Sequence, residues 1–128
     1  MIEFAEIHHV TLAVTDIKKA AQFYENVLGM TPRTDRPDFG FPGAWYSVGN
    51  QQLHLISVDD AKTLRGSDEI DSRDGHLALK VVSIPSLLKK LDEAGVLYQD
   101  RPDNKTPWHQ VYVTDPSGNV IEFNAPRS

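Results

Sequence analysis

Residues 7–30 read IHHVTLAVTDIKKAAQFYENVLGM, and residues 75–95 read GHLALKVVSIPSLLKKLDEAG. Each stretch begins with a short run of apolar and β-branched residues, which predicts a strand. Apolar residues then recur at helical spacing, and Gly29 and Gly95 stand where the two helices should end. Because a strand followed by a helix occurs twice, the sequence indicates two similar halves.

Each half continues with a predicted β-hairpin, because two apolar segments flank a turn signal in each. The paired segments are 44–48 with 51–58 around Gly49-Asn50, and 110–114 with 119–124 around Asp115–Gly118. Residues 59–74 between the halves are rich in acidic residues and predict a solvated crossover.

Nearly the same offset relates matched positions in the two halves, with single-residue slips in loops. His9 and His76 lie 67 positions apart, and His54 and Glu122 lie 68 positions apart. A strand-helix-strand-strand-strand unit exposes an apolar sheet face that it cannot bury alone. We therefore expect an α+β fold in which residues 1–128 form a single domain with a curled mixed sheet around a cleft. Two paired βαβββ modules, at about 5–58 and 75–125, would be joined by the charged crossover 59–74.

Charge and composition exclude several classes of protein. The net charge of −5 leaves no basic field for nucleic acid or anionic lipid. The N-terminus lacks the pattern of a secretory signal, and no apolar run is long enough to span a membrane, so we expect a cytoplasmic protein. With no cysteine in the chain, any metal must be held by histidine and carboxylate side chains.

Four polar residues occupy matched strand positions among apolar neighbours: His9, His54, His76 and Glu122. Since strand side chains alternate between faces, Glu122 points opposite to Ile121 and Phe123. A buried glutamate needs a compensating partner, a proton or a metal. Three imidazoles and one carboxylate suit one divalent metal, Zn²⁺, Ni²⁺, Mn²⁺ or Fe²⁺, with coordination positions left open.

The same residues carry a family resemblance. The first strand and helix, followed by QLHLI, GHLALKV and TDPSGNVIEFN, resemble the vicinal oxygen chelate superfamily over about residues 7–124. This superfamily includes glyoxalase I, methylmalonyl-CoA epimerase, extradiol dioxygenases, fosfomycin-resistance thiol transferases and bleomycin-binding proteins. The resemblance implies paired βαβββ modules, a divalent metal in the cleft and a homodimer, whose modules pair within a chain or are exchanged between subunits.

By resemblance, His9 and His76 match the metal histidines of the two modules, and Glu122 matches the terminal carboxylate. His54 stands where glyoxalases and epimerases present Glu or Gln, which leaves two roles open for it. As a fourth ligand it leaves two coordination positions for a bidentate substrate. Off the metal, it leaves a triad of two histidines and one carboxylate with three open positions, and it is then free to share proton transfer.

Four functions remain open. The leading hypothesis is a glyoxalase-type lyase or isomerase that stabilises an enediolate of a small substrate through two adjacent oxygens, with Glu122 and His54 as catalytic residues. The alternatives are a ring-cleaving Fe(II) dioxygenase, a thiol transferase of the fosfomycin-resistance type, for which no phosphonate-binding residues can be assigned, and a non-catalytic binding protein of the bleomycin-resistance type. The aromatic residues of the loop 32–46, among them Phe39, Phe41 and Trp45, favour an aromatic or cationic ligand for such a binding protein.

The residues expected to contact the small-molecule substrate are Thr11, Arg33, Trp45, Lys80, Trp108 and His109. Thr11 and Lys80 share strand faces with His9 and His76 respectively, whereas His109 is expected in a loop. Arg33, together with Arg36 on the same loop, can hold an anionic group such as a carboxylate.

Overall fold

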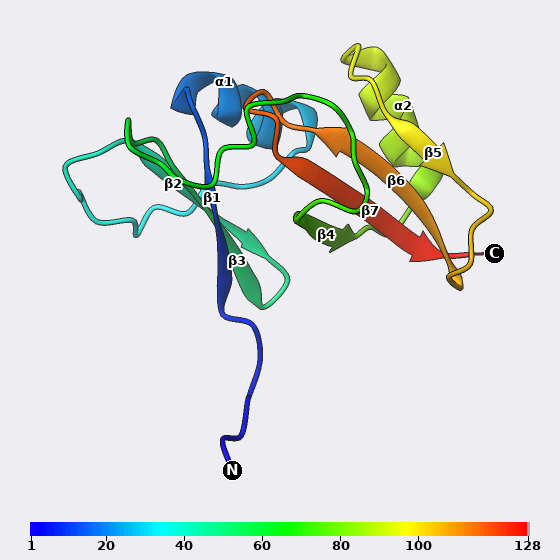
Figure 1. Cartoon of the computed structure of the whole chain (residues 1–128), viewed down its shortest axis with the longest axis horizontal. Helices are drawn as coiled ribbons and strands as arrows, with labels where there is room; N and C mark the ends of the chain where they lie inside the picture. Colours follow the sequence, from blue (N-terminus) through cyan, green and yellow to red (C-terminus); the bar gives the residue numbers. More distant parts are fainter. Residues whose placement is uncertain (128) are drawn as a thin grey trace. The chain divides into compact units, whose positions relative to one another are not determined.

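The computed structural model describes residues 1–127 and divides the chain into two compact units, Met1–Thr63 and Leu64–Ser128 (Figure 1). The two units follow the order of the two predicted modules, and the pairing of the modules remains a prediction. Within residues 1–127, no helix is long and apolar enough to cross a membrane.

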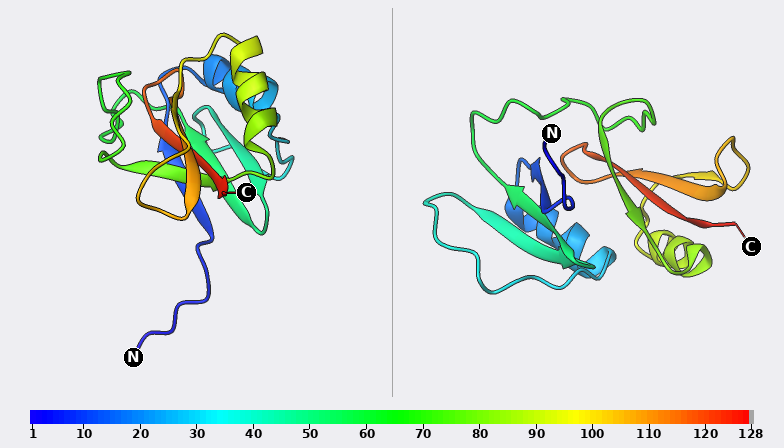
Figure 2. Two further views of the ribbon diagram at one scale, coloured as in Figure 1. Left: turned by 90° about the vertical axis from the view of Figure 1, so that its right-hand side faces the viewer. Right: turned by 90° about the horizontal axis from the view of Figure 1, so that it is seen from below.

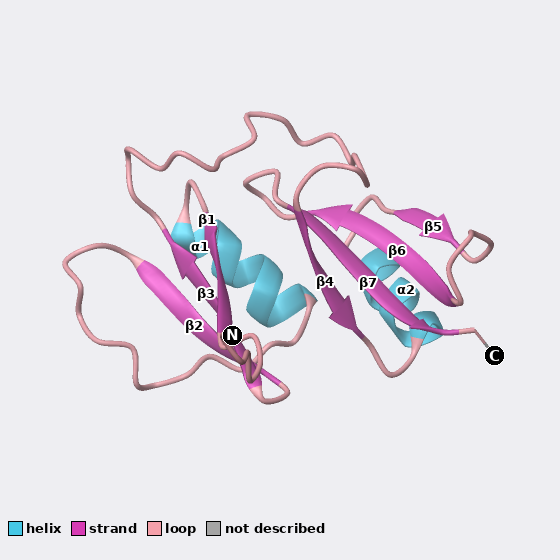
Figure 3. Ribbon diagram, turned by 60° about the horizontal axis from the view of Figure 1, so that its bottom comes forward, coloured by secondary structure: helices cyan, strands magenta, loops and turns pink. Residues whose placement is uncertain are grey.

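The first unit is built on a three-stranded sheet, sheet 1. Its elements are β1 (His9–Ala13), α1 (Ile17–Ala21), the π-helix η1 (Gln22–Val27), β2 (Gly43–Val48) and β3 (Gln51–Ile56). The strand order is β1-β3-β2, with β1 parallel and β2 antiparallel to β3 (Figure 3). Sheet 1 is therefore mixed, in agreement with the expected mixed α+β architecture.

The predicted first helix forms in two parts. The Asp16 carboxylate caps its start by accepting hydrogen bonds from the backbone nitrogens of Lys18 and Lys19 at 2.9 and 3.2 Å. After five residues the helix widens into η1, and it ends before Gly29, whose φ of 75° suits glycine. The Tyr46 hydroxyl donates to Glu25 Oε2 at 2.8 Å, so η1 packs on the Tyr46 side of sheet 1.

One predicted strand of the first module is reduced to a single bridge. Pro32 pairs with Tyr46 in an isolated antiparallel bridge, and no strand follows within 33–42. Proline has no backbone N–H to donate, and Pro32, Pro37 and Pro42 all lie in this segment. The loop 32–42 therefore stays irregular, which is the main departure from the predicted βαβββ pattern.

The second unit has the full βαβββ order on a four-stranded mixed sheet, sheet 2. Its elements are β4 (His76–Lys80), α2 (Ile84–Glu93), β5 (Gln99–Arg101), β6 (Trp108–Thr114) and β7 (Val120–Pro126). The strand order is β4-β7-β6-β5, with only β4 and β7 parallel. Figure 2 shows α2 lying across one face of this sheet.

Residues 65–74 of the crossover pack onto the strands of the second unit. The Arg65 guanidinium donates to the Gly118 carbonyl at 2.7 Å and to Asp74 Oδ2 at 2.7 Å. Thr114 and Arg101 bond the crossover at the Asp68 carbonyl and the Ser72 hydroxyl. These bonds hold the acidic crossover against sheet 2.

Each sheet has one face toward its helix and one face away from it, which we call the helix-free face. In sheet 1, strand pairing aligns Thr11, His54 and Trp45 on the helix-free face, since Tyr46 points to η1. In sheet 2, Ala78, Glu122 and Tyr112 are aligned in the same way. The two helix-free faces thus carry the polar residues that the sequence singled out.

Candidate metal and substrate site

Glu122 lies on the central strand β7 of sheet 2 and is only 5% exposed. Its Oε1 accepts hydrogen bonds from the Tyr112 hydroxyl at 2.9 Å, and its Oε2 accepts from Asn124 Nδ2 at 2.8 Å. Burial, together with the carboxylate beside it, raises the pKa of Tyr112 to about 12, so the hydroxyl remains a donor. The chain thus fixes the orientation of a buried carboxylate without neutralising it.

His76 lies beside this carboxylate. Its Nε2 is 3.2 Å from Glu122 Oε1, and its Nδ1 is 2.8 Å from the Asp74 carbonyl oxygen. A carbonyl oxygen only accepts, so Nδ1 must carry a proton, and in a neutral ring Nε2 then presents a lone pair to the carboxylate. This contact is favourable only with a proton between the two atoms, carried by the ring or by the carboxyl group, or with a metal ion that binds both. The donor chemistry of this pair therefore fits a divalent metal.

On sheet 1, three rings form a stack. The rings of His9 and His54 are 4.2 Å apart with an interplanar angle of 17°, and the rings of His54 and Trp45 are 4.3 Å apart at 9°. His54 Nε2 is hydrogen-bonded to Gln52 Oε1 at 2.8 Å. An imidazole lone pair lies in the plane of its ring, so the lone pairs of the stacked His9 and His54 rings lie in nearly parallel planes. The two faces of the His54 ring contact His9 and Trp45, and its Nε2 is bonded to Gln52.

The electrostatic state of His54 follows from its surroundings. The side chain is buried, and burial lowers its pKa below the ordinary value of 6.5, with His9 and His8 acting in the same direction. His9 in turn lies 2.8 Å from His8 through their Nδ1 atoms. A neutral His54 can accept a proton, which a metal-bound imidazole cannot do through its ligating atom.

The four predicted metal ligands therefore occur as two pairs, His9 with His54 in the first unit and His76 with Glu122 in the second. In the part of the chain from residue 1 to residue 127, no group of three or more His, Asp or Glu side chains is arranged to hold a metal ion. Each unit by itself supplies half of the predicted ligand set.

The predicted substrate residues of the first unit separate into two groups. Thr11 and Trp45 flank His54 by strand pairing and line a pocket of about 140 Å³. Arg33 instead makes two bonds to Asp35, at 3.0 and 2.8 Å, and one to the Ser47 hydroxyl at 2.9 Å. The guanidinium holds the pKa of Asp35 below its usual range, so the charge of Arg33 is already paired.

In the second unit, Lys80 and Trp108 share the helix-free face with the pair. Lys80 is exposed and lies four residues after His76 on β4, and Trp108 lies four residues before Tyr112 on β6 and is 38% exposed. For Lys80, this is the strand face that the alternation predicts.

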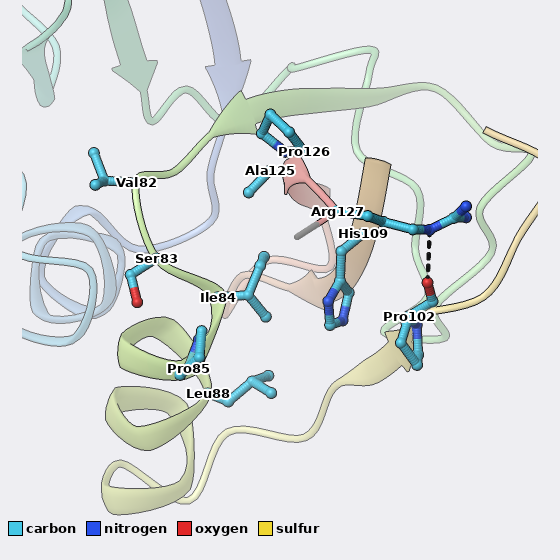
Figure 4. A pocket seen from close by; sticks show the side chains of 10 residues that line it. All are labelled: Val82, Ser83, Ile84, Pro85, Leu88, Pro102, His109, Ala125, Pro126 and Arg127. Carbon is cyan, nitrogen blue, oxygen red and sulfur yellow. Dashed lines mark hydrogen bonds between the residues drawn. The ribbon is translucent and has the colours of Figure 1, made fainter. Parts of the chain in front are cut away.

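His109 is placed differently from its prediction. It lies on strand β6 rather than in a loop, and it pairs with Ala125 on the face that α2 covers. Figure 4 shows its imidazole near Ile84 and Leu88 in a pocket of about 580 Å³, and its Nε2 bonds Asp100. Because β6 is a strand, His109 and Tyr112 point to opposite faces, so His109 is not brought together with Glu122.

Sequence reasoning did not identify the partners that orient the site: Gln52, Tyr112, Asn124 and the Asp74 carbonyl. Two of them could have been found. Asn124 shares a strand face with Glu122, and the tight turn Asp115–Gly118 sets the register that aligns Tyr112 with Glu122. The roles of Gln52 and Asp74 depend on side-chain and loop geometry that has no sequence signal.

Residues 6–123 match the family model of the Glyoxalase/Bleomycin resistance protein/Dioxygenase superfamily. The chain belongs to this superfamily. A relative in the superfamily, Glyoxylase I 4 of Arabidopsis thaliana, is 25% identical over 124 residues, which cover 95% of this chain and 71% of the relative.

Solved structures of the superfamily share the fold. A glyoxalase family protein from Bacillus anthracis has a TM-score of 0.80 and 25% identity, covering 98% of this chain and 99% of its own. TnmS3, an antibiotic binding protein from Streptomyces sp. CB03234, has a TM-score of 0.72 and 26% identity, covering 98% and 99%. The glyoxalase superfamily thus contains both enzymes and binding proteins that are similar to this chain.

Proposed function

We propose that the protein is a divalent-metal-dependent lyase or isomerase of the glyoxalase type. Its substrate would be a small molecule with two adjacent oxygens. The observation that supports this best is the approach of His76 Nε2 to the buried Glu122 Oε1, because an imidazole nitrogen and a carboxylate oxygen that face each other at 3.2 Å can serve as two ligands of one cation. Membership of the superfamily, with a glyoxylase I relative, supports the same reaction class.

The proposed ligands are His9, His76 and Glu122, with His54 as the fourth candidate, and the proposed metal is Zn²⁺, Ni²⁺, Mn²⁺ or Fe²⁺. When bound, a divalent ion supplies a Lewis acid that polarises two neighbouring oxygens. Tyr112 and Asn124 orient the carboxylate, and the Asp74 carbonyl fixes the ring of His76 with Nε2 available.

His54 is the proposed proton acceptor. Glyoxalases and epimerases present Glu or Gln at this position, and a neutral imidazole can take over proton transfer if it stays off the metal. The stack between His9 and Trp45, and the bond to Gln52, support that role over ligation. Glu122 is the second group proposed to accept and return a proton.

The contacts of the His54 ring with His9, Trp45 and Gln52 also support a second candidate function. If His54 is not a ligand, then His9, His76 and Glu122 form a set of two histidines and one carboxylate, which non-haem Fe(II) oxygenases use for substrate and dioxygen. A ring-cleaving dioxygenase is therefore the alternative proposal, and its dependence on oxygen distinguishes it from the lyase.

The test combines metal analysis with turnover. We expect the purified protein to contain a divalent metal, and we expect Glu122→Ala to lose it, whereas His54→Ala keeps it and loses turnover of a hemithioacetal. His109→Ala is the matched control, because His109 faces α2, and it should behave as the wild type. Oxygen-dependent ring cleavage would instead support the dioxygenase. A protein without metal that binds aromatic ligands tightly would be a binding protein and would overturn the proposal.

We further propose a homodimer, as is common in this superfamily, with size-exclusion chromatography and light scattering as the check. Whether modules pair within a chain or between copies is decided by mixing His9→Ala and Glu122→Ala chains. If modules pair between copies, a mixed dimer contains one site with both His9 and Glu122 intact, so mixing restores activity. If modules pair within a chain, every site lacks one of the two residues and the mixture stays inactive. The cytoplasmic location remains a prediction of the sequence.

A further inference from the structure

The pocket of about 140 Å³ on the helix-free face of sheet 1 has aromatic walls and one cation. The residues that matter here are Thr11, Arg36, Phe39, Phe41, Trp45 and His54. The rings of Phe39 and Phe41 are stacked at 5.8 Å, and the rings of Phe39 and Trp45 are 6.2 Å apart. Flat side chains therefore form most of the surface around the guanidinium of Arg36.

Among the described residues 1–127, Arg36 has no acidic partner. Its Nη2 donates to the Phe41 carbonyl at 3.0 Å, and its Nε is buried without an acceptor in the described part of the chain. No ion pair of the residues 1–127 includes it. Arg33, on the same loop, is bonded to Asp35 and Ser47. The two arginines therefore differ in whether their charge is available.

The position of the Arg36 guanidinium is fixed by packing. Its Cζ lies 5.1 Å from the Phe39 ring centroid and 5.6 Å from that of Phe41. A Cβ on Gly43 would lie 2.6 Å from Arg36 Nη2 and 2.6 Å from the Leu55 carbonyl oxygen, so the absence of a side chain at Gly43 leaves room for it. A charge held by rings and backbone loses little freedom when it binds an anion.

The size and shape of the pocket define the ligand class. A cavity of about 150 Å³ holds one benzene ring, and this pocket is of that size. Guanidinium groups bind carboxylates through two parallel hydrogen bonds, and they repel cations. We infer that this pocket binds a single planar aromatic ring that bears an anionic group such as a carboxylate, with Arg36 as the specificity residue. The inference rests on the proposed function, because it takes this pocket to be part of the substrate site. It adds that the substrate carries an aromatic ring with an anionic group.

Calorimetry with benzoate tests this inference, with benzyl alcohol as the neutral probe of similar shape and cyclohexanecarboxylate as the non-planar anion. The full chain is used both as purified and after treatment with EDTA. Titration near pH 8 keeps His54 in the pocket neutral, because burial lowers the pKa of His54 below the ordinary value of 6.5. We expect benzoate to bind at least about ten-fold more tightly than either of the other probes.

Variants locate the anion. Arg36→Gln should weaken benzoate binding about ten-fold while leaving benzyl alcohol unchanged, and Arg36→Lys should retain part of the difference. Arg33→Gln is the matched control and should bind benzoate as the wild type does. Equal binding of benzoate and benzyl alcohol to the wild type would overturn the inference, as would equal losses in Arg33→Gln and Arg36→Gln.

Failure of this inference is distinguishable from failure of the proposed function. Benzoate binding to the EDTA-treated chain does not require a metal, whereas the metal content of the purified protein does not require benzoate. If the protein binds benzoate through Arg36 but contains no metal, the inference about the ligand class holds and the proposed metal-dependent activity is wrong. A protein that contains metal but does not distinguish benzoate from benzyl alcohol gives the reverse result.

Discussion

His76 Nε2 lies 3.2 Å from Glu122 Oε1, although 46 positions separate the two residues in the chain. Parallel pairing of β4 with β7 places His76 beside Val120 and Ala78 beside Glu122, so the imidazole and the carboxylate are close neighbours on one face. The geometry of this pair depends on the hydrogen bonds that Tyr112 and Asn124 donate to the Glu122 carboxylate.

Tyr112→Phe should weaken the binding of the proposed metal about ten-fold, because Glu122 loses a donor that orients its carboxylate. Isothermal titration with Zn²⁺ into chelator-treated protein measures the change. Tyr98→Phe is the control, since the Tyr98 hydroxyl bonds Asp92 on α2 and does not contact Glu122. If both variants bind Zn²⁺ with equal affinity, Tyr112 does not help to orient the proposed metal ligand Glu122.

His54 should make the free energy of unfolding depend on pH. Burial lowers the pKa of His54 in the folded protein, whereas the unfolded chain binds the proton near the ordinary 6.5. The neutral ring therefore contributes stability above pH 6.5, and this contribution is lost as the pH falls through the lower, folded-state pKa. Urea unfolding of the wild type and of His54→Gln should show the difference between them shrink in acid; a difference that grows in acid would contradict the assignment.

Gly118→Ala should destabilise the fold by about 2 kcal/mol or more. Gly118 has a φ of +85°, and a Cβ there would lie 2.1 Å from the Ser67 carbonyl oxygen of the crossover. Gly75→Ala is the matched control, because no φ strain is present there and a Cβ would meet nothing within 4 Å. Thermal unfolding compares the two variants, and similar melting temperatures would show that the crossover can move away at little cost.

Leu91→Ala should lower the free energy of unfolding by about 2–5 kcal/mol, because this α2 side chain is fully buried and its loss leaves a cavity. Leu97→Ala makes the same chemical change at a position that is 86% exposed, and it should stay within about 0.5 kcal/mol of the wild type. Denaturant titration measures both. A comparable loss in the two variants would indicate that the apolar stripe of α2 is not the main contact of the helix.

The predicted elements were largely confirmed where local signals agree. The helix at Ile84–Glu93 has a Ser83 cap, a proline in its first turn and Gly95 after its end, and each of these acts within a few residues. Residues 32–42 were predicted as a loop and are irregular, but the βαβββ pattern expected for the first module requires one more strand than forms there, because the three prolines of the loop limit its strand pairing. The widening of the first helix into η1 had no local signal either.

The sequence by itself determined the mixed α+β class, the order of the two halves and the strand faces on which His54 and Glu122 stand. These properties follow from periodicity and turn chemistry, which act over short distances along the chain. Tertiary structure decided which side chains meet: that His54 stacks between two rings, that the charge of Arg33 is paired whereas that of Arg36 is not, and that His109 faces α2. Such contacts depend on strand register and loop packing, so residues far apart in sequence must be placed in space before their chemistry can be assigned.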